Sequence, residues 1–354
     1  MTPSLSIVLP SHNRADLLRL CLASVNLYCP TATEVIVVDD GSPGGTVSAT
    51  AADFPGVRCL RLPHQSGFCV AANAGIHAAT GPVAELLNDD TEVTPGWAEP
   101  ALACFADPAV AAVAPLVLRW PGVGPDGPIV DSAGDRYFVG GVAGKRGHGQ
   151  PLSADHLRSG KVFGASASSA FYRRAALLEV GGFPEEFGAY FEDVDLAFRL
   201  HWAGWEVLYE PASRVLHRVA ASHGRSCRRL LQQQSRNEER VFWRNLPRGE
   251  LLGALPAHGA VLLAKVWRRW REGNLVPFLR GRLEVLADIP ALLRHRRRLR
   301  QSAAGVGIDG WGMDKRFIER PMLRRGATLD TAAEHPPRRP CRPLPMGQAR
   351  SSPL

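Results

Sequence analysis

Three pairs of adjacent acidic residues carry most of the chemistry that this sequence offers. The pairs are Asp39-Asp40, Asp89-Asp90 and Glu192-Asp193. Each pair follows an apolar run or opens an expected helix, although a lone pair is usually only a turn or a helix cap. If one fold brings all three together, their negative charge is costly unless a cation neutralises it. The pairs therefore predict a site for a hard divalent ion and a phosphate-bearing substrate.

The third pair lies in the segment from Phe187 to His217. Glu192 and Asp193 stand at the entrance of a predicted helix, which has an apolar side and a natural stop at Gly204. A strand-like run over residues 205–209 comes next, followed by a lone histidine, His217. A solitary histidine is usually a core or surface residue. Carboxylates at a helix start with a histidine one strand later nevertheless suit acid/base and metal chemistry.

The elements that must position these pairs alternate along the first part of the chain. Near-continuous apolar runs, such as residues 34–39, are typical of strands covered on both faces. Similar runs at 4–10, 57–62 and 82–87 are separated by helical patterns. Because ligands of open α/β sheets bind at the carboxyl ends of strands, the acidic pairs stand where a ligand is met. The predicted fold class is α/β, with a Rossmann-like, mostly parallel, doubly wound sheet.

Charge divides the chain into unequal parts. The 354 residues carry a formal net charge of +8. Residues 1–220 hold 15 basic and 23 acidic side chains, whereas residues 221–354 hold 27 and 11. An acidic body is thus followed by a basic region. We expect an α/β domain over residues 1–220, a basic amphipathic helical extension over 221–300, and a disordered tail over 301–354.

Neither the cysteines nor the apolar segments suggest export. The seven cysteines are scattered singly and odd in number, which favours reduced thiols over a disulfide framework or a zinc site. The N-terminus lacks the basic region and apolar core of a signal peptide. The best candidate for a membrane span, residues 251–266, is interrupted by Pro256 and His258 and is shorter than the roughly 20 residues required. We expect a cytoplasmic protein that does not cross a membrane.

Four segments between residues 4 and 218 form a more specific pattern. They read SIVLPSHNRADLLRLCLASV, VIVVDDGS, HQSGFCVAANAGIHAATGPVAELLNDDTEVTPGW and VGGFPEEFGAYFEDVDLAFRLHWAGWEVLYEPASRVLH. In this order they resemble the motifs of a family 2 glycosyltransferase with the GT-A fold, in particular of its rhamnosyltransferase-like branch. Four ordered motifs are a far stronger signal than any single acidic pair.

The resemblance implies that the strand ends bind a nucleotide-sugar donor. The turn after the first strand and the first acidic pair would hold the nucleotide, since a carboxylate there can accept a hydrogen bond from a pyrimidine N3–H. The second pair would contribute at the end of the strand predicted at residues 82–87. The donor-binding residues implied in this way are Pro10, Ser11, Asp39, Asp40, Asn88 and Asp89.

The resemblance also implies a divalent cation, Mn²⁺ or Mg²⁺. Asn88-Asp89-Asp90 occupies the position of a DxD motif, whose last aspartate usually binds the metal and the diphosphate. Asn88 departs from that motif, because many relatives have an aspartate there. His217 matches a histidine that completes the metal site in several relatives. The implied metal ligands are therefore Asp90, Asp89 and His217.

The chemistry of sugar transfer explains the remaining carboxylates. A metal neutralises the charge on the departing diphosphate, and the acceptor hydroxyl must lose a proton as it attacks. Asp193 matches the catalytic base of the family, and its neighbours Glu192 or Asp195 would raise its pKa. The implied reaction is a single displacement with inversion. It moves a hexosyl or deoxyhexosyl group to a hydroxyl of a glycan or lipid-linked acceptor in cell-envelope polysaccharide synthesis.

Two other classes of protein share parts of this pattern. A catalytically silent, nucleotide-sugar-binding homologue could act as a partner subunit, although Asp90, Asp193 and His217 are intact. A sugar-phosphate nucleotidyltransferase shares the α/β plan. That class normally opens with a glycine-rich phosphate loop after its first strand, and residues 10–14 contain no glycine.

The basic region after residue 220 has three interpretations. No nucleic-acid-binding motif accompanies the charge, so we expect no nucleic acid. A solvated helical surface is the simplest explanation. Interleaved arginine and tryptophan at residues 267–271 instead favour peripheral contact with the anionic inner face of the cell membrane.

Residues 120–160 are rich in glycine and proline and show little periodicity. Structureless loops of this length are uncommon in compact domains and are often functional. We predict a long loop or hairpin excursion over the site that sets which acceptor fits.

Overall fold

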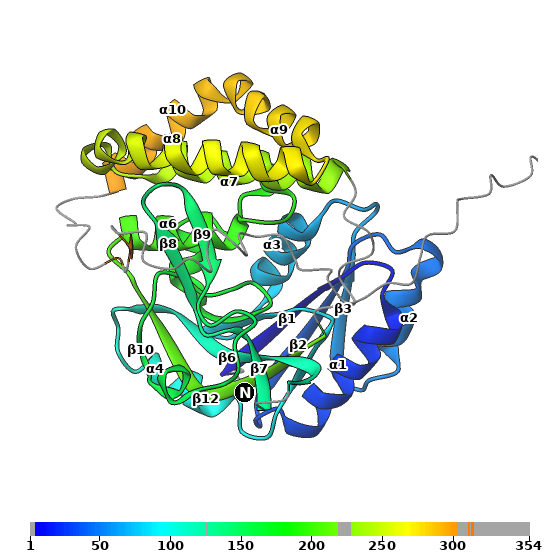
Figure 1. Cartoon of the computed structure of the whole chain (residues 1–354). Coiled ribbons are helices and arrows are strands. Elements are labelled where there is room, and N and C mark those ends of the chain that lie inside the picture. Colours follow the sequence, from blue (N-terminus) through cyan, green and yellow to red (C-terminus); the bar gives the residue numbers. More distant parts are fainter. Residues whose placement is uncertain (1–3, 125–126, 219–227, 303–310, 312, 315–354) are drawn as a thin grey trace, which may run out of the picture.

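The computed structural model describes residues 4–124, 127–218, 228–302, 311 and 313–314. Within them the body is a ten-stranded sheet in the order β10-β12-β6-β11-β4-β1-β2-β3, with β5 beside β12 and β7 beside β6. A layer of long helices lies across one end of this body (Figure 1). The predicted disordered tail falls mostly outside the described residues. In that region Trp311 is buried, and β13 (Met313–Asp314) pairs with β8 (Asp135–Phe138).

Four parallel strands form one half of the sheet. β1 lies between β2 and β4, and β2 also pairs with β3, all in parallel. Ser11 pairs with Asp39, so the carboxyl ends of β1 and β2 meet at one edge. The strands are β1 (Leu5–Ser11), β2 (Thr33–Asp39), β3 (Val57–Arg61) and β4 (Val83–Leu87). The predicted α/β class is confirmed.

The other half of the sheet is mixed. β11 (Ser169–Arg173) runs antiparallel between β4 and β6 (Val110–Gly124), and β12 (Glu206–His217) runs parallel to β6. The sequence predicted a strand only as far as Tyr209. β12 continues because its register shifts between Glu210 and Arg214, which accommodates a proline that cannot donate to the ladder. Two short strands complete this half, namely β5 (Thr91–Val93) and β10 (Gly160–Lys161).

Apolar side chains cover both faces of the sheet. Along β1, Leu5 and Ile7 belong to the cluster that contains α1, whereas Val8 belongs to the cluster that contains α3. Successive side chains of a strand point to opposite faces, which explains why these strands read as continuous apolar runs. The helices of the body are α1 (Ala15–Tyr28), α2 (Thr46–Ala52), α3 (Phe68–Ala78), α4 (Ala98–Cys104), α5 (Arg174–Glu179) and α6 (Glu192–Trp202).

The described part of residues 120–160 forms hairpins and not one long loop. β6 returns as β7 (Gly127–Ser132), and β8 pairs with β9 (Val142–Lys145), both in antiparallel fashion. The two ladders satisfy the backbone polar groups of a segment whose side chains offer little periodicity. The hairpin alternative of the prediction is therefore the correct one.

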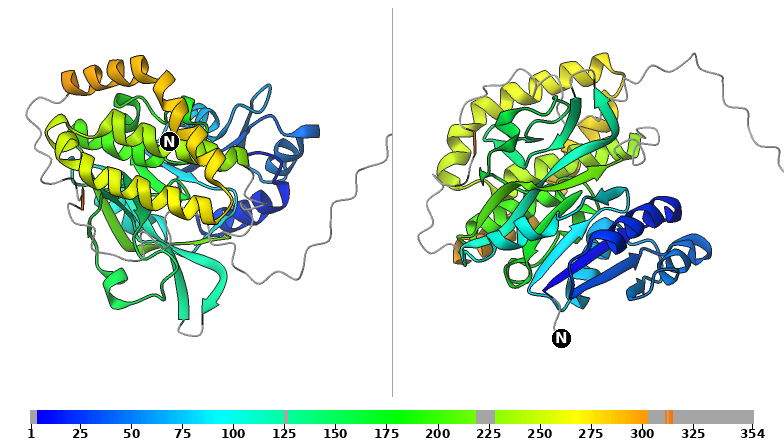
Figure 2. Two further views of the ribbon diagram at one scale, coloured as in Figure 1. Left: turned by 45° about the horizontal axis from the view of Figure 1, so that its top comes forward. Right: turned by 90° about the horizontal axis from the view of Figure 1, so that it is seen from below.

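Residues 228–302 form the helical layer, which Figure 2 shows from two further sides. α7 and α9 cross closely at Gly281, where a Cβ would lie 2.2 Å from the carbonyl oxygen of Gln232. No helix in the described part of the chain is long and apolar enough to span a membrane. The helices are α7 (Arg228–Asn245), α8 (Arg248–Arg271), α9 (Leu275–Ala287) and α10 (Ile289–Ser302).

A buried glutamate on β4 makes the stability of the fold depend on pH. Glu85 is fully buried and accepts hydrogen bonds from Trp97 Nε1 and Ser169 Oγ, both at 3.1 Å. Burial raises the pKa of Glu85 to about 8 despite these bonds. An unfolded glutamate titrates near pH ~4.3. The folded protein therefore holds this proton more tightly, and stability present at acid pH is lost as the pH rises through about 8.

Glu85→Gln should remove most of this dependence, since it keeps the side-chain volume and cannot ionise. We expect the free energy of unfolding of the variant to exceed that of the wild type at pH 9 by about 2–5 kcal/mol. Urea unfolding at pH 5, 7 and 9 measures this difference. Glu99→Gln, on the exposed face of α4, is the matched control. A Glu85→Gln variant that loses stability with pH as steeply as the wild type would contradict the assignment.

Candidate active site

Polar side chains from several strand ends gather at one edge of the sheet. Ser11 Oγ, at the end of β1, donates to Asp89 Oδ2 after β4 at 2.7 Å. The N–H of Asn88 donates to the carbonyl of Ser168 at 3.0 Å, and the N–H of the preceding residue, Ala167, donates to Asp193 Oδ2 at 3.1 Å. The second and third acidic pairs thus lie on either side of one short segment.

The first acidic pair is tied to loops. Asp39 Oδ1 accepts a hydrogen bond from the N–H of Ser42 at 2.8 Å. Burial would raise the pKa of Asp39, but hydrogen bonds from neighbouring serines outweigh it and lower the pKa. The two oxygens of Asp40 accept the N–H groups of residues 66–67 at 2.6 and 2.9 Å. Asp39 therefore shapes the loop after β2, and Asp40 fixes the start of α3.

Arg14 is a site residue that the sequence analysis did not single out. Its two Nη atoms lie 3.0 Å from Asp89 Oδ1 and 2.9 Å from Asp90 Oδ2, as a fork that holds both carboxylates. Burial raises the pKa of Asp89 to about 6, although Arg14 and the hydroxyl of Ser11 act in the opposite direction. The only sequence signal for Arg14 is its place in the loop that follows β1.

His217 lies between two carboxylates at the end of β12. β12 pairs with β5 so that His217 is opposite Thr91, the residue after Asp90. Its Nε2 lies 3.2 Å from Asp90 Oδ1, and its Nδ1 lies 3.0 Å from Asp131 Oδ2. Burial would lower the pKa of His217, but the two carboxylates raise it to about 9. Strand pairing thus brings together an aspartate and a histidine that are far apart in the chain.

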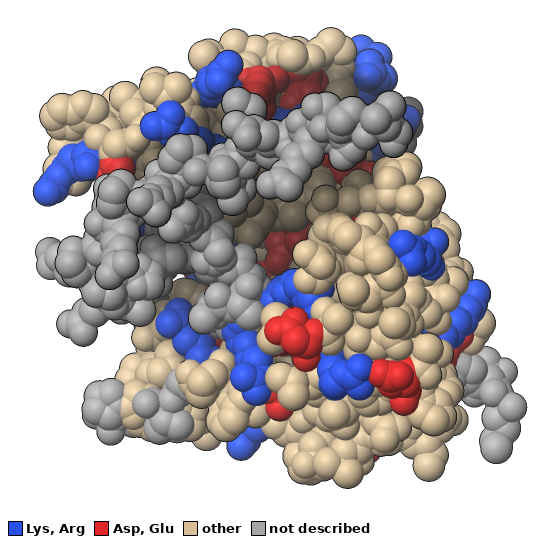
Figure 3. All heavy atoms as spheres, turned by 90° about the vertical axis from the view of Figure 1, so that its right-hand side faces the viewer, with Lys and Arg blue, Asp and Glu red and all other residues tan. Residues whose placement is uncertain are grey.

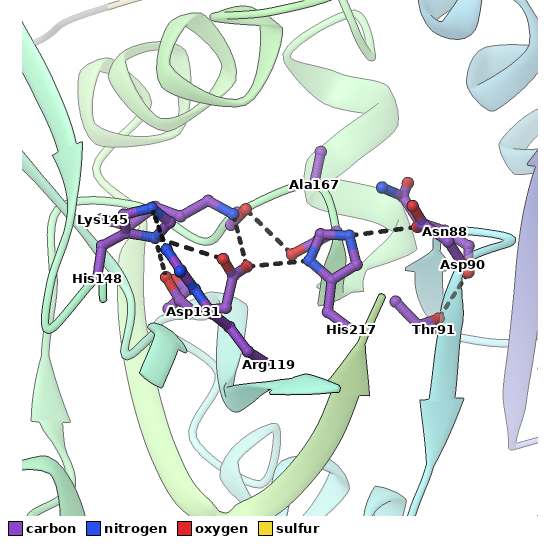
Figure 4. Close-up of polar contacts among 12 residues, drawn as sticks. Asn88, Asp90, Thr91, Arg119, Asp131, Lys145, His148, Ala167 and His217 are labelled. Carbon is purple, nitrogen blue, oxygen red and sulfur yellow. Dashed lines mark hydrogen bonds and ion pairs between the residues drawn. The ribbon is translucent and has the colours of Figure 1, made fainter. Parts of the chain in front are cut away.

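Asp131 is the centre of a polar network drawn in Figure 4. Its Oδ2 also accepts a hydrogen bond from Lys145 Nζ at 2.9 Å, and His148 Nδ1 lies 3.3 Å from its Oδ1. Arg119 reaches the other ring nitrogen of His148 at 3.0 Å. Burial would raise the pKa of Asp131, but Lys145 and the two histidines hold it well below its usual range. No sequence motif marks Asp131, which lies alone in the glycine- and proline-rich hairpins.

Asp193 is the more accessible carboxylate of the third pair. It is half-buried, whereas only 6% of Glu192 is exposed. Its Oδ1 accepts the N–H of Val194 at 2.8 Å. Burial raises the pKa of Asp193. The pKa of Glu192 is raised well above its usual range, by burial and by the neighbouring charge of Asp193. Asp135 on β8 joins this cluster, since burial and the charge of Asp193 also raise its pKa.

Asp195 does not have the influence on Asp193 that the sequence analysis expected. It is fully buried, with Arg199 Nε at 2.8 Å and Arg244 Nε at 3.1 Å. Burial would raise the pKa of Asp195, but the arginines lower it well below its usual range. Asp195 is therefore part of a neutralised structural ion pair between α6 and α7. Burial, and not the charge of Asp195, raises the pKa of Asp193.

The turn that leads into α6 is strained and held by α7. Tyr190 and Phe191 have φ angles of 70° and 66°, which large side chains rarely adopt. Asn237 Nδ2 of α7 donates to three carbonyl oxygens within residues 187–190 at 2.9–3.0 Å. Such backbone strain persists only where the surroundings impose it. The helical layer therefore fixes the position of Asp193.

The site fits a divalent cation that the substrate helps to bind. No group of three or more His, Cys, Asp or Glu side chains that could hold a metal occurs among the described residues. His217 Nε2 faces Asp90 Oδ1 at 3.2 Å without a well-aligned hydrogen bond, while a second carboxylate binds the other ring nitrogen, which is the arrangement that orients metal-ligating histidines. Mg²⁺ is usually bound by one or two carboxylates together with phosphate oxygens and water. Asp90 supplies such a carboxylate, and His217 adds a ring nitrogen beside it.

The face of the molecule shown in Figure 3 is hollowed between the helical layer and the sheet body. Acidic side chains are visible inside the hollow. A cation and a ligand that carries phosphate would offset such negative charge.

Comparison with known families agrees with this geometry. The model of glycosyl transferase family 2 matches residues 6–181, about half of the chain. The chain is a member of glycosyl transferase family 2. The matched residues run from β1 to the turn after α5 and include the first two acidic pairs. The family predicted from the sequence is confirmed.

Two curated relatives come from Mycobacterium tuberculosis. An N-acetylglucosaminyl-diphospho-decaprenol L-rhamnosyltransferase is 29% identical over 308 residues, which cover 78% of this chain and 98% of the relative. A pre-mycofactocin glycosyltransferase is 33% identical over 216 residues, covering 60% of this chain and 42% of the relative. The first similarity supports the rhamnosyltransferase-like branch of the family.

Two solved structures share the fold. GalNAc-T7 with UDP, GalNAc and Mn²⁺ aligns with a TM-score of 0.53 at 18% identity, covering 73% of this chain and 55% of that chain. The mannosyltransferase PcManGT of Pyrobaculum calidifontis, in complex with GDP-Man and Mn²⁺, aligns with a TM-score of 0.51 at 19% identity, covering 86% and 85%. At these identities the likeness concerns the fold alone, and it confirms the predicted GT-A fold.

Proposed function

We propose that the protein is a metal-dependent, inverting glycosyltransferase that moves a sugar from a nucleotide-sugar donor to a hydroxyl of a lipid-linked or other glycan acceptor. One observation supports this most. His217 Nε2 approaches Asp90 Oδ1 to 3.2 Å at the strand ends. The short segment of residues 167–168 is hydrogen-bonded both to Asn88 and to Asp193. Metal ligands and a candidate base therefore flank one location.

Asp90 and His217, with Asp89 beside them, would hold Mn²⁺ or Mg²⁺. The bound ion neutralises the charge that develops on the donor diphosphate as it leaves. Asp131 keeps the ring of His217 in one orientation. Arg14 adds a positive charge at the same edge, where its fork suits phosphate oxygens as well as carboxylates.

Asp193 would accept the proton of the acceptor hydroxyl. Its hydrogen bonds to Ala167 and Val194 fix the direction of the carboxylate, and its raised pKa makes it a better base than an ordinary aspartate. Glu192 is more deeply buried, which leaves Asp193 as the accessible base of the pair. Attack from the side opposite the diphosphate gives inversion.

The donor nucleotide would lie over the ends of β1, β2 and β4. Asp40, whose side chain already fixes the start of α3, would accept the N3–H of a pyrimidine. Asp39 is fully buried, so we propose that its role is to shape this pocket. The Pro10-Ser11 turn and Asn88 would border the diphosphate. Each of these residues stands at the edge where β1, β2 and β4 end.

The acceptor is proposed from similarity. The relative that matches over 98% of its own length is named for L-rhamnosyl transfer to N-acetylglucosaminyl-diphospho-decaprenol. We propose a deoxyhexosyl transfer of this type to a polyprenyl-diphosphate-linked saccharide in cell-envelope polysaccharide synthesis. The β6–β7 and β8–β9 hairpins, which bring Asp131 and Lys145 to the site, would border this acceptor.

A thermal-shift screen tests the donor and the metal together. The matching nucleotide sugar should raise the unfolding temperature by several degrees. A ligand present at about 100 times its Kd adds about 2.7 kcal/mol to the free energy of unfolding. The shift should need Mn²⁺ or Mg²⁺ and should shrink with EDTA. His217→Ala should lose the metal-dependent part, whereas Glu99→Gln should keep it. A donor-induced shift that is the same with and without metal would contradict the proposed site.

A silent nucleotide-sugar-binding subunit remains the alternative, while membership of a glycosyltransferase family sets aside the sugar-phosphate nucleotidyltransferase. Slow hydrolysis of the donor, measured with Mn²⁺ and without acceptor, separates an enzyme from a silent subunit. An active enzyme should release nucleoside diphosphate. Binding without any release would favour the silent subunit.

A further inference from the structure

The outward side of α8 is an uninterrupted apolar stripe. Leu252, Leu263, Trp267 and Trp270 are 75%, 73%, 57% and 66% exposed and recur at helical spacing. The opposite side of the helix buries Ala254, His258 and Val261 against the layer. A surface helix normally exposes polar residues. α8 therefore shows an apolar side to solvent over most of its 24 residues.

The neighbouring helices also expose apolar side chains. The described residues expose few large hydrophobic side chains elsewhere, so the layer differs from the rest of the surface. On α9, Val276, Leu283 and Leu286 are each more than 60% exposed. Exposed apolar side chains that gather on neighbouring helices, and are not scattered singly, mark an interaction surface. The remaining exposed apolar residues of the layer are Leu255, Leu279, Ile289 and Leu293.

Arginines dominate the charges near this surface, and the exposed Glu272 is paired with two of them. A cavity of about 160 Å³ between α6, α7, α8 and α10 is lined by arginines, and no acidic residue lines it among the described residues. The lining arginines are Arg244, Arg248, Arg296 and Arg300. Arg271, Arg280, Arg294 and Arg297 are also exposed on these helices. An apolar surface bordered by arginine is complementary to a lipid surface that carries anionic headgroups.

We propose that α8 and α9 insert their exposed apolar side, centred on Leu263, Trp267 and Trp270, into the interface of an anionic membrane. The sequence favoured an electrostatic contact through the arginines at residues 267–271. Arg268 and Arg269 are instead paired with Glu272 at 2.7 Å. Burial of apolar side chains therefore carries most of the binding, and the exposed arginines select the anionic lipid.

The layer also ties the membrane to the active site. α7 supports α9 at the Gly281 crossing, and its Asn237 holds the turn that precedes Asp193. Membrane insertion would therefore set the orientation of the catalytic base towards the lipid surface. This step rests on the proposed function, since a lipid-linked acceptor would be presented at that surface.

Vesicle flotation tests the proposal with the full-length chain and no donor. The wild type should float with phosphatidylcholine–phosphatidylglycerol vesicles, less with phosphatidylcholine alone, and largely keep its binding at high salt. The triple variant Leu263→Ser, Trp267→Ser and Trp270→Ser should lose at least about tenfold in vesicle affinity. Leu20→Ser with Leu27→Ser, on exposed positions of α1, should leave it unchanged.

Two further measurements separate this proposal from the proposed function. The triple variant should keep its unfolding temperature and its donor hydrolysis, yet lose transfer to a lipid-linked acceptor in vesicles. If the wild type binds vesicles but has no transfer activity, the proposed function is contradicted, whereas the proposed membrane insertion is still supported. Equal flotation of the wild type and the triple variant would overturn the insertion. The insertion would also be overturned if the wild type were a dimer and the triple variant a monomer, because the apolar stripe would then bind a second copy of the chain.

Discussion

Asp193→Asn is expected to lower the rate of sugar transfer by about 10²–10⁴-fold, the usual contribution of a positioned general base. The affinity for the donor should stay nearly unchanged. Asp193 is the accessible carboxylate of its pair, and its oxygens are directed by the N–H groups of Ala167 and Val194. An amide of nearly the same shape keeps one of these bonds and cannot take a proton from the acceptor.

Initial rates at saturating donor and acceptor measure the loss, and a donor titration by calorimetry measures the affinity. Asp155→Asn, on a side chain that is 85% exposed, is the matched control. Glu192→Gln should cost much less activity, because Glu192 is buried and is not placed to reach an acceptor hydroxyl. If Asp193→Asn lost donor binding and kept the turnover of bound donor, Asp193 could not be the base.

Local patterns in the sequence were enough to predict the α/β sheet and the strand ends. Continuous apolar runs predicted β1, β2 and β4, because a strand covered on both faces needs no polar alternation. The helix start at Glu192 was predicted from its acidic first turn and its stop at Gly204. Each of these signals depends on residues that are neighbours in the chain.

Partners chosen by strand pairing could not be predicted in the same way. Asp131 and Lys145 belong to hairpins whose glycines and prolines hide the strand pattern, and only the folded sheet brings them to His217. Arg14 stands in a loop, where no periodicity marks it. Asp195 looked like a charged neighbour of Asp193 because the arginine that neutralises it, Arg244, comes from α7.

Asp131→Asn is expected to weaken metal binding by about 10–100-fold, which is typical for the loss of a carboxylate that orients a metal-ligating histidine. Asp131 Oδ2 accepts the hydrogen bond of His217 Nδ1 at 3.0 Å, and an asparagine that turns its amide nitrogen to the ring would favour the wrong tautomer. Calorimetric titration of Mn²⁺ in the presence of nucleoside diphosphate measures the loss. Lys145→Gln removes another partner of Asp131 and should have a much smaller effect.

A double variant tests whether Asp131 acts through His217. Asp131→Asn added to His217→Ala should weaken metal binding no further than His217→Ala alone, whereas losses that multiply would show an independent role.

The pH dependence gives a second criterion. Carboxylates raise the pKa of His217 to about 9, so the ion must displace a proton at neutral pH, and wild-type affinity should rise with pH up to about 9. Without the charge of Asp131 this competition weakens, so the deficit of Asp131→Asn should be larger at pH 9 than at pH 7. A merely structural defect would give the same deficit at both pH values.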